Sequence, residues 1–344
     1  MSMASFYCLL GNVARIVVLT VLVFEIVQAD SYGIEGVEST VDFEGGRQLL
    51  RLVEPPPLWL SYRGGTIFSG REVPVYIIWY GTFSPSVRSH VVDFFASFQP
   101  GAQEIRPSVR SWWALTSDYK DSEGSPIASA VELKQEIFDD YSMGRYLTQD
   151  HIEGLIGRAL GPTFPVSQTA FYLVLTAEDV YVEGFCTQRC ASHFVTKENL
   201  FSAPPGSVGQ KIPFAWVGNA ASQCPGKCAW PFAKEEYGYD TDPLKPPSGN
   251  VGADGMIMNI ASMLAGTATN PLNNGFYQGD EDLPFESATA CAGVFGPNSY
   301  SGYPGQLQMD ATGASFNANG ISNRKYLLPA LWSPVTSSCS HPLP

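Results

Sequence analysis

Two cysteine pairs with identical spacing carry the clearest chemical potential in the sequence. The segments "FCTQRCASHF" and "SQCPGKCAWPF" are both Cys-x3-Cys pairs, and His193 follows three residues after Cys190. Thiolates and imidazole are ligands of structural zinc, so four cysteines, or three with His193, are one interpretation. The N-terminal residues predict a secretory signal, and an oxidising compartment favours disulfides over thiolates. We therefore favour disulfides at these positions.

Six cysteines remain once Cys8 leaves with the signal, and an even number in a secreted chain indicates three disulfides. The six are Cys186, Cys190, Cys224, Cys228, Cys291 and Cys339. Each Cys-x3-Cys pair can close on itself, because residues i and i+4 on a turn come within bridging distance. Cys291 would then bond Cys339. Cross-pairing between the two loops is the alternative, and the spacing leaves both connectivities open.

Nucleophilic hydrolysis needs a Ser or Cys, a His base and an orienting acid. The chain offers four histidines and contains no Gly-x-Ser-x-Gly turn: His90, His151, His193 and His341. We expect His90 and His151 to lie on the solvated, polar sides of helices, and His341 falls in the C-terminal tail. A serine or cysteine hydrolase is therefore not favoured.

Two other chemistries remain open at the level of residue type. A glycosidase needs two carboxylates, and seven acids fall near predicted loops without any pair being distinguished by spacing. They are Asp179, Glu183, Asp254, Asp280, Glu281, Asp282 and Glu286. A sugar-binding surface needs exposed rings, for which the candidates are Trp112, Trp113, Trp230, Tyr300 and Tyr303. Trp112 and Trp113 point about 100° apart on a helix, so core packing explains at least one of them.

The elements that would position these residues follow from hydrophobic patterning. Apolar and aromatic runs predict buried strands at 73–81, 169–180 and 212–219. Helical spacing predicts helices at four segments with the sequences "SPSVRSHVVDFFASF", "SVRSWWALTSDY", "SAVELKQEIFDDY" and "TQDHIEGLIGRAL". In the first, Ser84 is the expected N-cap and Pro85 the first helical residue. In the last, Thr148 is the expected cap and Gly161 the stop.

A further helix is predicted from "DGMIMNIASMLAGTATNP", which carries no charge after Asp254 although the chain has a net charge of −13. Such neutrality indicates a helix buried at the centre of the domain. Strands interleaved with helices predict an α/β or α+β fold, a single sheet covered by helices. The region beyond about residue 291 is rich in Gly, Pro, Asn and Ser, so we expect a loop-rich, disulfide-stapled C-terminal part.

The N-terminal region predicts a secreted protein. Residues 1–29 have the basic, apolar and small-residue regions of a cleaved signal peptide. Residues 30–57 are acidic and Gly-rich and are expected to form a flexible lead-in, followed by a single domain at 58–344. The basic residues do not cluster, which argues against nucleic acid as a partner, and against a membrane once the signal is cleaved.

Five motifs together closely resemble the plant Exordium-like family, also called phosphate-induced protein 1. They are "PVYIIWYGTFSPSVRSHVVDFFASF", "VEGFCTQRCASHF", "AWVGNAASQCPGKCAWPF", "GADGMIMNIASMLAGTATNP" and "ATGASFNANGISNRKYLLPALW". The resemblance implies an extracellular, cell-wall-associated protein of the apoplast, linked to cell expansion and brassinosteroid-responsive growth. It implies neither catalytic residues nor a cofactor. The partner would be an unidentified wall component or extracellular protein.

A weaker resemblance concerns the neutral helix. Zincin-type metallopeptidases place His-Glu-x-x-His on a helix, so that two ligands face one metal. In some secreted bacterial and fungal proteins a related helix reads His-Glu-x-x-Glu, then Thr-Asp-Pro, then a Glu five residues before a Cys. Here the helix ends in Thr-Asn-Pro at residues 269–271, and Glu286 lies five residues before Cys291.

Aligned in this way, Ser262, Met263 and Gly266 occupy the positions of the ligands and the catalytic Glu. None of the three can bind zinc well or act as a general base. This resemblance implies a metallopeptidase scaffold that has lost its metal, and a plain buried helix explains the same residues. Both interpretations predict no metal, no cofactor and no catalytic residue at this helix.

We therefore expect a non-enzymatic secreted protein that acts by binding. Two alternatives stay open. The first is an extracellular hydrolase, either metallopeptidase-like or an acid-based glycosidase, and the second is a module that binds wall glycans.

Overall fold

The computed structural model describes residues 58–100, 104–197, 209–235, 241–280 and 284–342. The chain divides into two units, Met1–Pro55 and Pro56–Pro344, and all described residues belong to the second. The predicted signal peptide and acidic lead-in lie outside the described residues. Within those residues, no helix combines the length and apolar character needed to cross a membrane.

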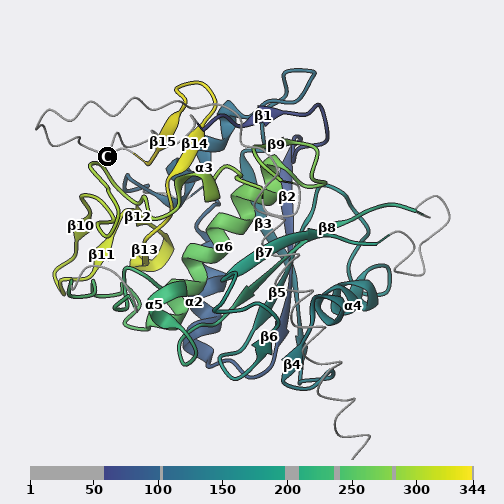
Figure 1. The fold of residues 1–344 in the computed structure, drawn as a ribbon, viewed down its shortest axis with the longest axis horizontal. Helices are drawn as coiled ribbons and strands as arrows, with labels where there is room; N and C mark the ends of the chain where they lie inside the picture. Colours follow the sequence, from purple (N-terminus) through teal and green to yellow (C-terminus); the bar gives the residue numbers. More distant parts are fainter. Residues whose placement is uncertain (1–57, 101–103, 198–208, 236–240, 281–283, 343–344) are drawn as a thin grey trace, which may run out of the picture. The chain divides into compact units, whose positions relative to one another are not determined.

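The centre of the second unit is a five-stranded sheet with the order β3-β2-β5-β8-β7 (Figure 1). Four strands run parallel and β7 is antiparallel to β8 at one edge. The strands are β2 (Glu72–Tyr80), β3 (Ala130–Asp139), β5 (Phe171–Thr176), β7 (Ala191–Val195) and β8 (Pro213–Gly218). The interior strands β5 and β8 are buried along their whole length, as their unbroken apolar sequences predict.

Helices cover both faces of this sheet. The chain moves outward from β2 to β3 and then back across β2 to β5, so right-handed crossovers place the two connecting helices on opposite faces. In Figure 1, α2 and α6 accordingly lie on one side of the sheet and α4 on the other. The helical segments are α2 (Pro85–Ala96), α3 (Val109–Trp113), η1 (Ala114–Asp118), α4 (Gln149–Ala159), α5 (Pro225–Cys228), α6 (Val251–Thr269), η2 (Thr289–Cys291) and η3 (Ile321–Asn323).

The predicted helix starts are confirmed where capping chemistry is present. The Ser84 hydroxyl accepts a hydrogen bond from the Val87 amide, and Pro85 opens α2. Thr148 caps α4 through the amide of His151, and the His151 ring accepts a hydrogen bond from the Thr148 amide in return. The prediction of a solvated His151 therefore needs correction, since its ring belongs to this half-buried cap.

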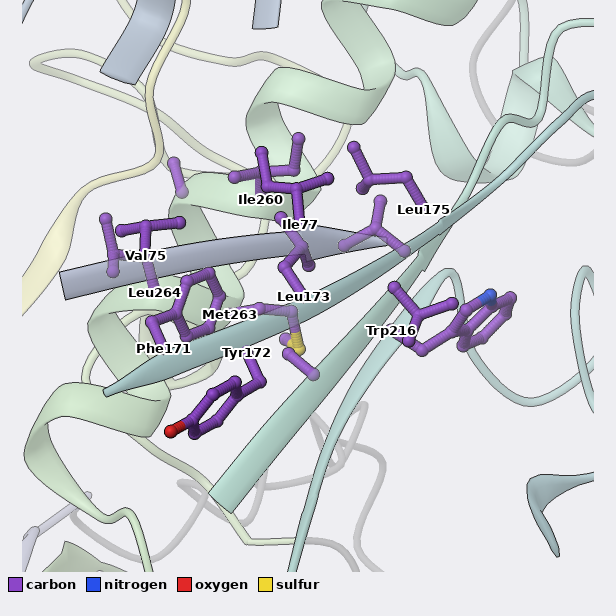
Figure 2. Close-up of a cluster of buried hydrophobic side chains, with 14 of the residues drawn as sticks. Val75, Ile77, Phe171, Tyr172, Leu173, Leu175, Trp216, Ile260, Met263 and Leu264 are labelled. Atoms are coloured by element: carbon purple, nitrogen blue, oxygen red, sulfur yellow. The ribbon is translucent and has the colours of Figure 1, made fainter. Parts of the chain in front are cut away.

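The neutral segment is the central helix, as predicted. Buried residues make up 16 of the 19 positions of α6. Figure 2 shows Ile260, Met263 and Leu264 of α6 beside strand residues such as Ile77 and Leu173. Burying each large aliphatic side chain contributes about 1.5–3 kcal/mol, so a charge along this helix would be costly unless paired. The one charged residue of α6, Asp254, is paired.

One predicted helix was wrong. The segment 129–141 contains strand β3, which pairs in parallel with β2 along the whole of that strand. The apolar residues of this short segment fit both a helical and a strand pattern, and helix propensities differ by less than about 1 kcal/mol between ordinary residues. Pairing with β2 satisfies backbone hydrogen bonds along both strands, so this pairing outweighs the helix propensity.

The expectation of a single sheet also needs correction, because small ladders surround the central sheet. They pair β1 (Ser61–Tyr62) with β9 (Phe276–Tyr277), β4 (Tyr146–Leu147) with β6 (Tyr181–Val182), β10 (Gln308–Met309) with β11 (Ser315–Phe316), β12 (Ala318–Asn319) with β13 (Lys325–Tyr326), and β14 (Leu331–Ser333) with β15 (Ser338–Ser340). The last three ladders lie in the loop-rich C-terminal part. There, the side-chain amide of buried Asn317 donates to the Phe295 and Leu328 carbonyls and accepts from the Leu328 amide. These bonds satisfy main-chain groups that no strand pairing satisfies.

Three disulfides are present, and their connectivity decides between the two alternatives. Cys186 bonds Cys224, Cys190 bonds Cys228, and Cys291 bonds Cys339. Local closure of each Cys-x3-Cys pair is therefore wrong, and cross-pairing is correct. The physical reason is the sheet order: adjacent strands β7 and β8 bring the loop before β7 against the loop after β8. Two parallel disulfides then join these loops.

Candidate functional site

Two buried pairs of a histidine and an acid flank helix α6. His90 of α2 faces Asp254 in the first turn of α6, and His193 of β7 faces Glu286, which packs beside Gly266 near the other end of the helix. All four side chains are at most 5% exposed. Buried ionisable groups of this kind are candidates for a functional site, because burial in a protein is costly unless a role or a partner retains them.

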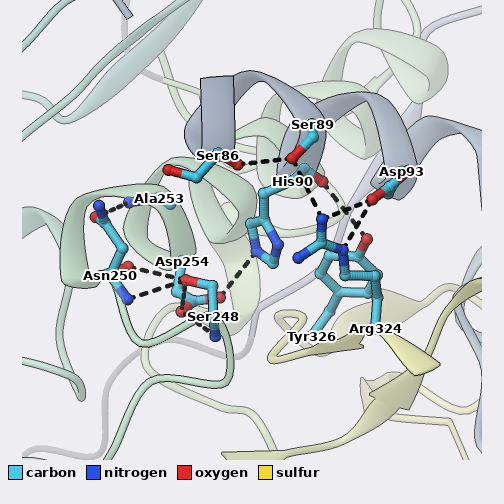
Figure 3. Close-up of polar contacts among 10 residues, drawn as sticks. All are labelled: Ser86, Ser89, His90, Asp93, Ser248, Asn250, Ala253, Asp254, Arg324 and Tyr326. Carbon is cyan, nitrogen blue, oxygen red and sulfur yellow. Dashed lines mark hydrogen bonds and ion pairs between the residues drawn. The ribbon is translucent and has the colours of Figure 1, made fainter. Parts of the chain in front are cut away.

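In the first pair, Asp254 organises its neighbours (Figure 3). One carboxylate oxygen lies 3.0 Å from Nε2 of His90. The other accepts hydrogen bonds from the amide and the hydroxyl of Ser248, at 2.9 and 2.6 Å. Asp254 also lies in the first turn of α6, where the helix dipole stabilises a negative charge. The network thus fastens the start of α6 to α2.

This arrangement differs from a catalytic triad. The Ser248 hydroxyl donates to the acid, whereas a nucleophilic serine would be bonded to the histidine. Nδ1 of His90 has no hydrogen-bond partner among the described residues. His90 and Ser248 line a cavity of 270 Å³ together with Arg324, which forms an ion pair with Asp93. The prediction that His90 is solvated was wrong, because the ring lies between α2 and α6.

In the second pair, Nδ1 of His193 lies 3.0 Å from Oε1 of Glu286. The same oxygen accepts a hydrogen bond of 2.8 Å from the side-chain amide of Asn270, at the C-cap of α6. Burial alone would lower the pKa of His193, but the charge and hydrogen bond of Glu286, with the Pro271 carbonyl nearby, outweigh it and raise that pKa. Glu286 therefore shifts the His193 ring toward its protonated form.

The His193 ring is buried, and both Glu286 and the Pro271 carbonyl act on it as hydrogen-bond acceptors. His193 and Glu286 line a cavity of 410 Å³, within the range of about 300–1,000 Å³ typical of ligand sites. Strand β7 forms one wall, and Met263 of α6 contributes to another. This cavity, lined by Gln149, Arg189, Ala191–Val195, Met263, Asn273, Pro284, Glu286 and Thr289, is called the β7 cleft below.

Ser262, Met263 and Gly266, the three positions named on the neutral helix, have different surroundings in this structure. Met263 lines the β7 cleft, and Gly266 lies against Glu286 so closely that a β-carbon at 266 would overlap the carboxylate. Ser262 does not line the cleft; its hydroxyl donates to the Met258 carbonyl within the helix. Glu286 therefore fills the space that a side chain at position 266 would need.

The other acids named from the sequence do not form a comparable pair. Asp179 forms an ion pair with Arg145 and accepts a hydrogen bond from Tyr141, both near the surface. Glu183 and Asp280 are exposed, and Glu281 and Asp282 lie outside the described residues. Among the residues that the structure describes, no group of three or more His, Cys, Asp or Glu side chains could hold a metal ion.

The aromatic candidates separate by burial. Trp112 and Trp113 are both buried in the core, so neither can stack on a sugar. Tyr300 is 69% exposed and its ring lies 5.0 Å from that of Tyr303. Trp230 and Tyr303 line a separate cavity of 260 Å³. His341 is part of the C-terminal tail, where burial lowers its pKa.

The residue types and their spacing single out all four residues of the two pairs and do not show which histidine meets which acid. Each pair nevertheless leaves one local indication in the sequence. Asp254 is a single charge in an otherwise neutral helix, which requires a buried partner once the helix is central. Gly266 lies at a contact position of the same helix, where a missing side chain leaves room for a neighbour. The partners themselves, His90 and Glu286, could not be assigned without the sheet order.

The fold and the two pairs define a mixed α/β protein with three disulfides and an acid–histidine pair near each end of a central helix. The chain matches the model of the phosphate-induced protein 1 conserved region over residues 60–342, and it belongs to this family.

Several plant proteins are similar over most of their length. Protein PHOSPHATE-INDUCED 1 of Nicotiana tabacum is 44% identical over 298 residues, 86% of this chain and 92% of that protein. Protein EXORDIUM of Arabidopsis thaliana is 43% identical over 290 residues, covering 82% and 88% of the two chains. Protein EXORDIUM-like 2 of the same plant is 42% identical over 292 residues, covering 84% and 91%. No solved structure matches the chain.

Proposed function

We propose that this protein is a secreted, cell-wall-associated factor that acts by binding, on a zincin-like scaffold that has lost its metal. One observation carries the scaffold proposal: Glu286 packs against Gly266 beside Met263. These are three of the four positions that the metallopeptidase pattern predicts to share one site, and Glu286 is 20 residues beyond Gly266 in sequence.

The side chains at this site support binding over metal chemistry. Met263 stands where the general base would be and has no basic atom, and Gly266 offers no ligand atom. His193 and Glu286 bond one another instead, which satisfies the carboxylate. The site therefore keeps its cavity and lacks the donor set of a hydrolytic metal centre.

The proposal of secretion rests on the N-terminal sequence and on the disulfides. Three disulfides within residues 186–339 are typical of proteins that fold in an oxidising compartment. In the plant context of the family, we place the mature protein in the apoplast and the wall. A role in cell expansion and brassinosteroid-responsive growth, through an unidentified wall component or extracellular partner, completes the proposal. It requires no cofactor.

The test uses the mature chain, purified with its disulfides intact. Elemental analysis of the native protein is expected to find zinc well below one equivalent, and a fluorescent casein substrate is expected to stay intact. A fluorescent fusion expressed in plant cells is expected to remain with the wall after plasmolysis. Stoichiometric zinc with peptide turnover that is lost in Glu286→Gln would overturn the non-enzymatic proposal, and intracellular retention would overturn the location.

A wall-glycan-binding module is the second candidate, favoured by one observation. Tyr300 and Tyr303 form an aromatic pair at the surface, and Tyr303 shares a cavity with Trp230. Exposed rings of this kind can stack on sugars. Binding to a wall-glycan array that is lost in Tyr300→Ala and Tyr303→Ala, and kept in the distant Tyr146→Ala, would support this candidate. No binding to any wall glycan would remove it.

A further inference from the structure

We propose that the β7 cleft binds an extended peptide segment that adds to the free edge of β7 and places a carboxylate beside the guanidinium of Arg189. The inference rests on the proposed function, since it takes the cleft as a binding site and not as a catalytic one. It names the class of partner, which is an extracellular peptide or an extended protein segment with an acidic group.

The first argument is the orientation of the β7 backbone. The Gly218 amide donates to the Cys190 carbonyl, and the Thr196 amide donates to the Ile212 carbonyl. In an antiparallel ladder, residues whose N–H and C=O groups bond the neighbouring strand alternate with residues whose groups point away from it. Ala191, His193 and Val195 therefore turn their N–H and C=O groups to the outer edge, where no other strand of the described residues pairs with them.

The second argument is where β7 is exposed. The His193 side chain is only 3% exposed, yet the residue as a whole is half-buried. The exposed part of His193 is therefore its main chain. All five residues of β7 fall in this half-buried class. An edge with accessible main-chain groups is a template for pairing with another extended chain.

The third argument is that the edge and the cavity are one surface. Each residue of β7 lines the 410 Å³ cleft, and the opposite wall is formed by α6 and by residues 284–289. A peptide paired with β7 would thus direct alternate side chains into the cleft. A flat edge without this cavity would offer affinity from the main chain and no selectivity for a side chain.

The fourth argument is charge. Arg189, His193 and Glu286 are the charged residues that line the cleft, so two basic groups face one acid in a chain of net charge −13. Nε of Arg189 is buried without a hydrogen-bond partner among the described residues. An unpaired buried donor is costly, and a carboxylate beside the guanidinium would accept from it. A basic or wholly apolar peptide would leave this donor unpaired.

The experiment screens the mature protein against a positional-scanning array of amidated heptapeptides and a matched array with free C-termini. We expect Asp or Glu at one fixed position to bind at least about tenfold more tightly than Asn or Gln, as charge-assisted hydrogen bonds require. Selection of free C-termini in the second array would assign the carboxylate to the chain end. The best binder is then resynthesised with N-methyl groups on alternate residues, and we expect binding to fall at least tenfold in one of the two registers.

Two protein variants separate the contributions. Val195→Pro removes one outward N–H and leaves the inward pairs with β8, so it should weaken all peptides. Arg189→Met should remove the preference for acid over amide and retain main-chain binding. Arg158→Met, on the exposed surface of α4, is the matched control and should bind like the wild type.

Three results would overturn the inference. They are an array without binders, binding that N-methylation does not affect in either register, and a dimer in sedimentation that Val195→Pro dissociates, which would make a second copy the occupant of the edge. None of these results bears on zinc content or casein turnover. The proposed function therefore stands or falls separately.

Discussion

The carboxylate of Glu286 occupies the space beside Gly266 in which a β-carbon would lie. The same carboxylate holds His193 of β7 and Asn270 at the end of α6. The missing side chain on the helix, the acid from the following loop and the histidine on the edge strand are thus parts of one contact. A substitution at Gly266, Glu286 or His193 should therefore alter the packing and hydrogen bonds of the other two residues.

Gly266→Ala should be destabilising although alanine is the better helix former. The new methyl group overlaps the Glu286 carboxylate, which cannot withdraw without breaking its bonds to His193 and Asn270. We expect a loss of about 1–3 kcal/mol in the free energy of unfolding, measured with urea. Gly154→Ala on α4 is the control, since its nearest neighbour would be Cε of Met143 at 3.4 Å. It should be neutral or gain up to about 1 kcal/mol. Equal stability of the two variants would contradict the contact.

The disulfide connectivity predicts which tryptic peptides stay linked without reduction. Trypsin cleaves after Arg189 and after Lys227 and so separates both Cys-x3-Cys pairs. We expect peptide 159–189 linked to 212–227, and 190–197 linked to 228–234, in mass spectrometry. Peptide 159–189 linked to 190–197 would instead show local closure and reject the cross-pairing.

The His193–Glu286 pair should make stability depend on pH above neutrality. The pKa of His193 is raised in the folded protein above its ordinary value of 6.5. The folded state therefore binds the proton more tightly, and this stabilisation is full below pH 6.5 and is lost as pH rises through the raised pKa. Urea unfolding from pH 6 to 9 should show the wild type losing stability relative to Glu286→Gln.

The control for that series is Glu183→Gln, an exposed acid changed in the same way. It should follow the wild type at every pH. If Glu286→Gln and the wild type lose stability in parallel across the range, the raised pKa does not arise from this pair.

Asp254→Asn should cost about 1.5–3 kcal/mol, because it removes the charge that accepts from Ser248 and faces His90. Asp93→Asn is the matched change at the better-solvated pair with Arg324, where about 0–1 kcal/mol is expected. A double-mutant cycle with His90→Gln should give a coupling energy above about 0.5 kcal/mol. Additive effects would mean that His90 and Asp254 are neighbours without an energetic link.

Much of the fold follows from signals within a few residues of chain. The Ser84 cap with Pro85 defines the start of α2, and the neutral run beyond Asp254 identifies the buried helix α6. These signals are readable because capping and burial periodicity act between near neighbours. The segment that contains β3 has no such local signal, because its conformation depends on pairing with β2, which lies more than 40 residues earlier.

The residues that could do chemistry can be read from the order of amino acids alone: the cysteines, the histidines, and the acids Asp254 and Glu286. The family and the central helix can be read from it as well. Which of these residues contact one another depends on the three-dimensional fold. Cys186 meets Cys224 because β7 and β8 are adjacent, and His90 meets Asp254 across 164 residues because α2 and α6 cover the same face of the sheet. Such pairings are set by the order of strands and the side on which each helix crosses, and no local pattern of residues records that order.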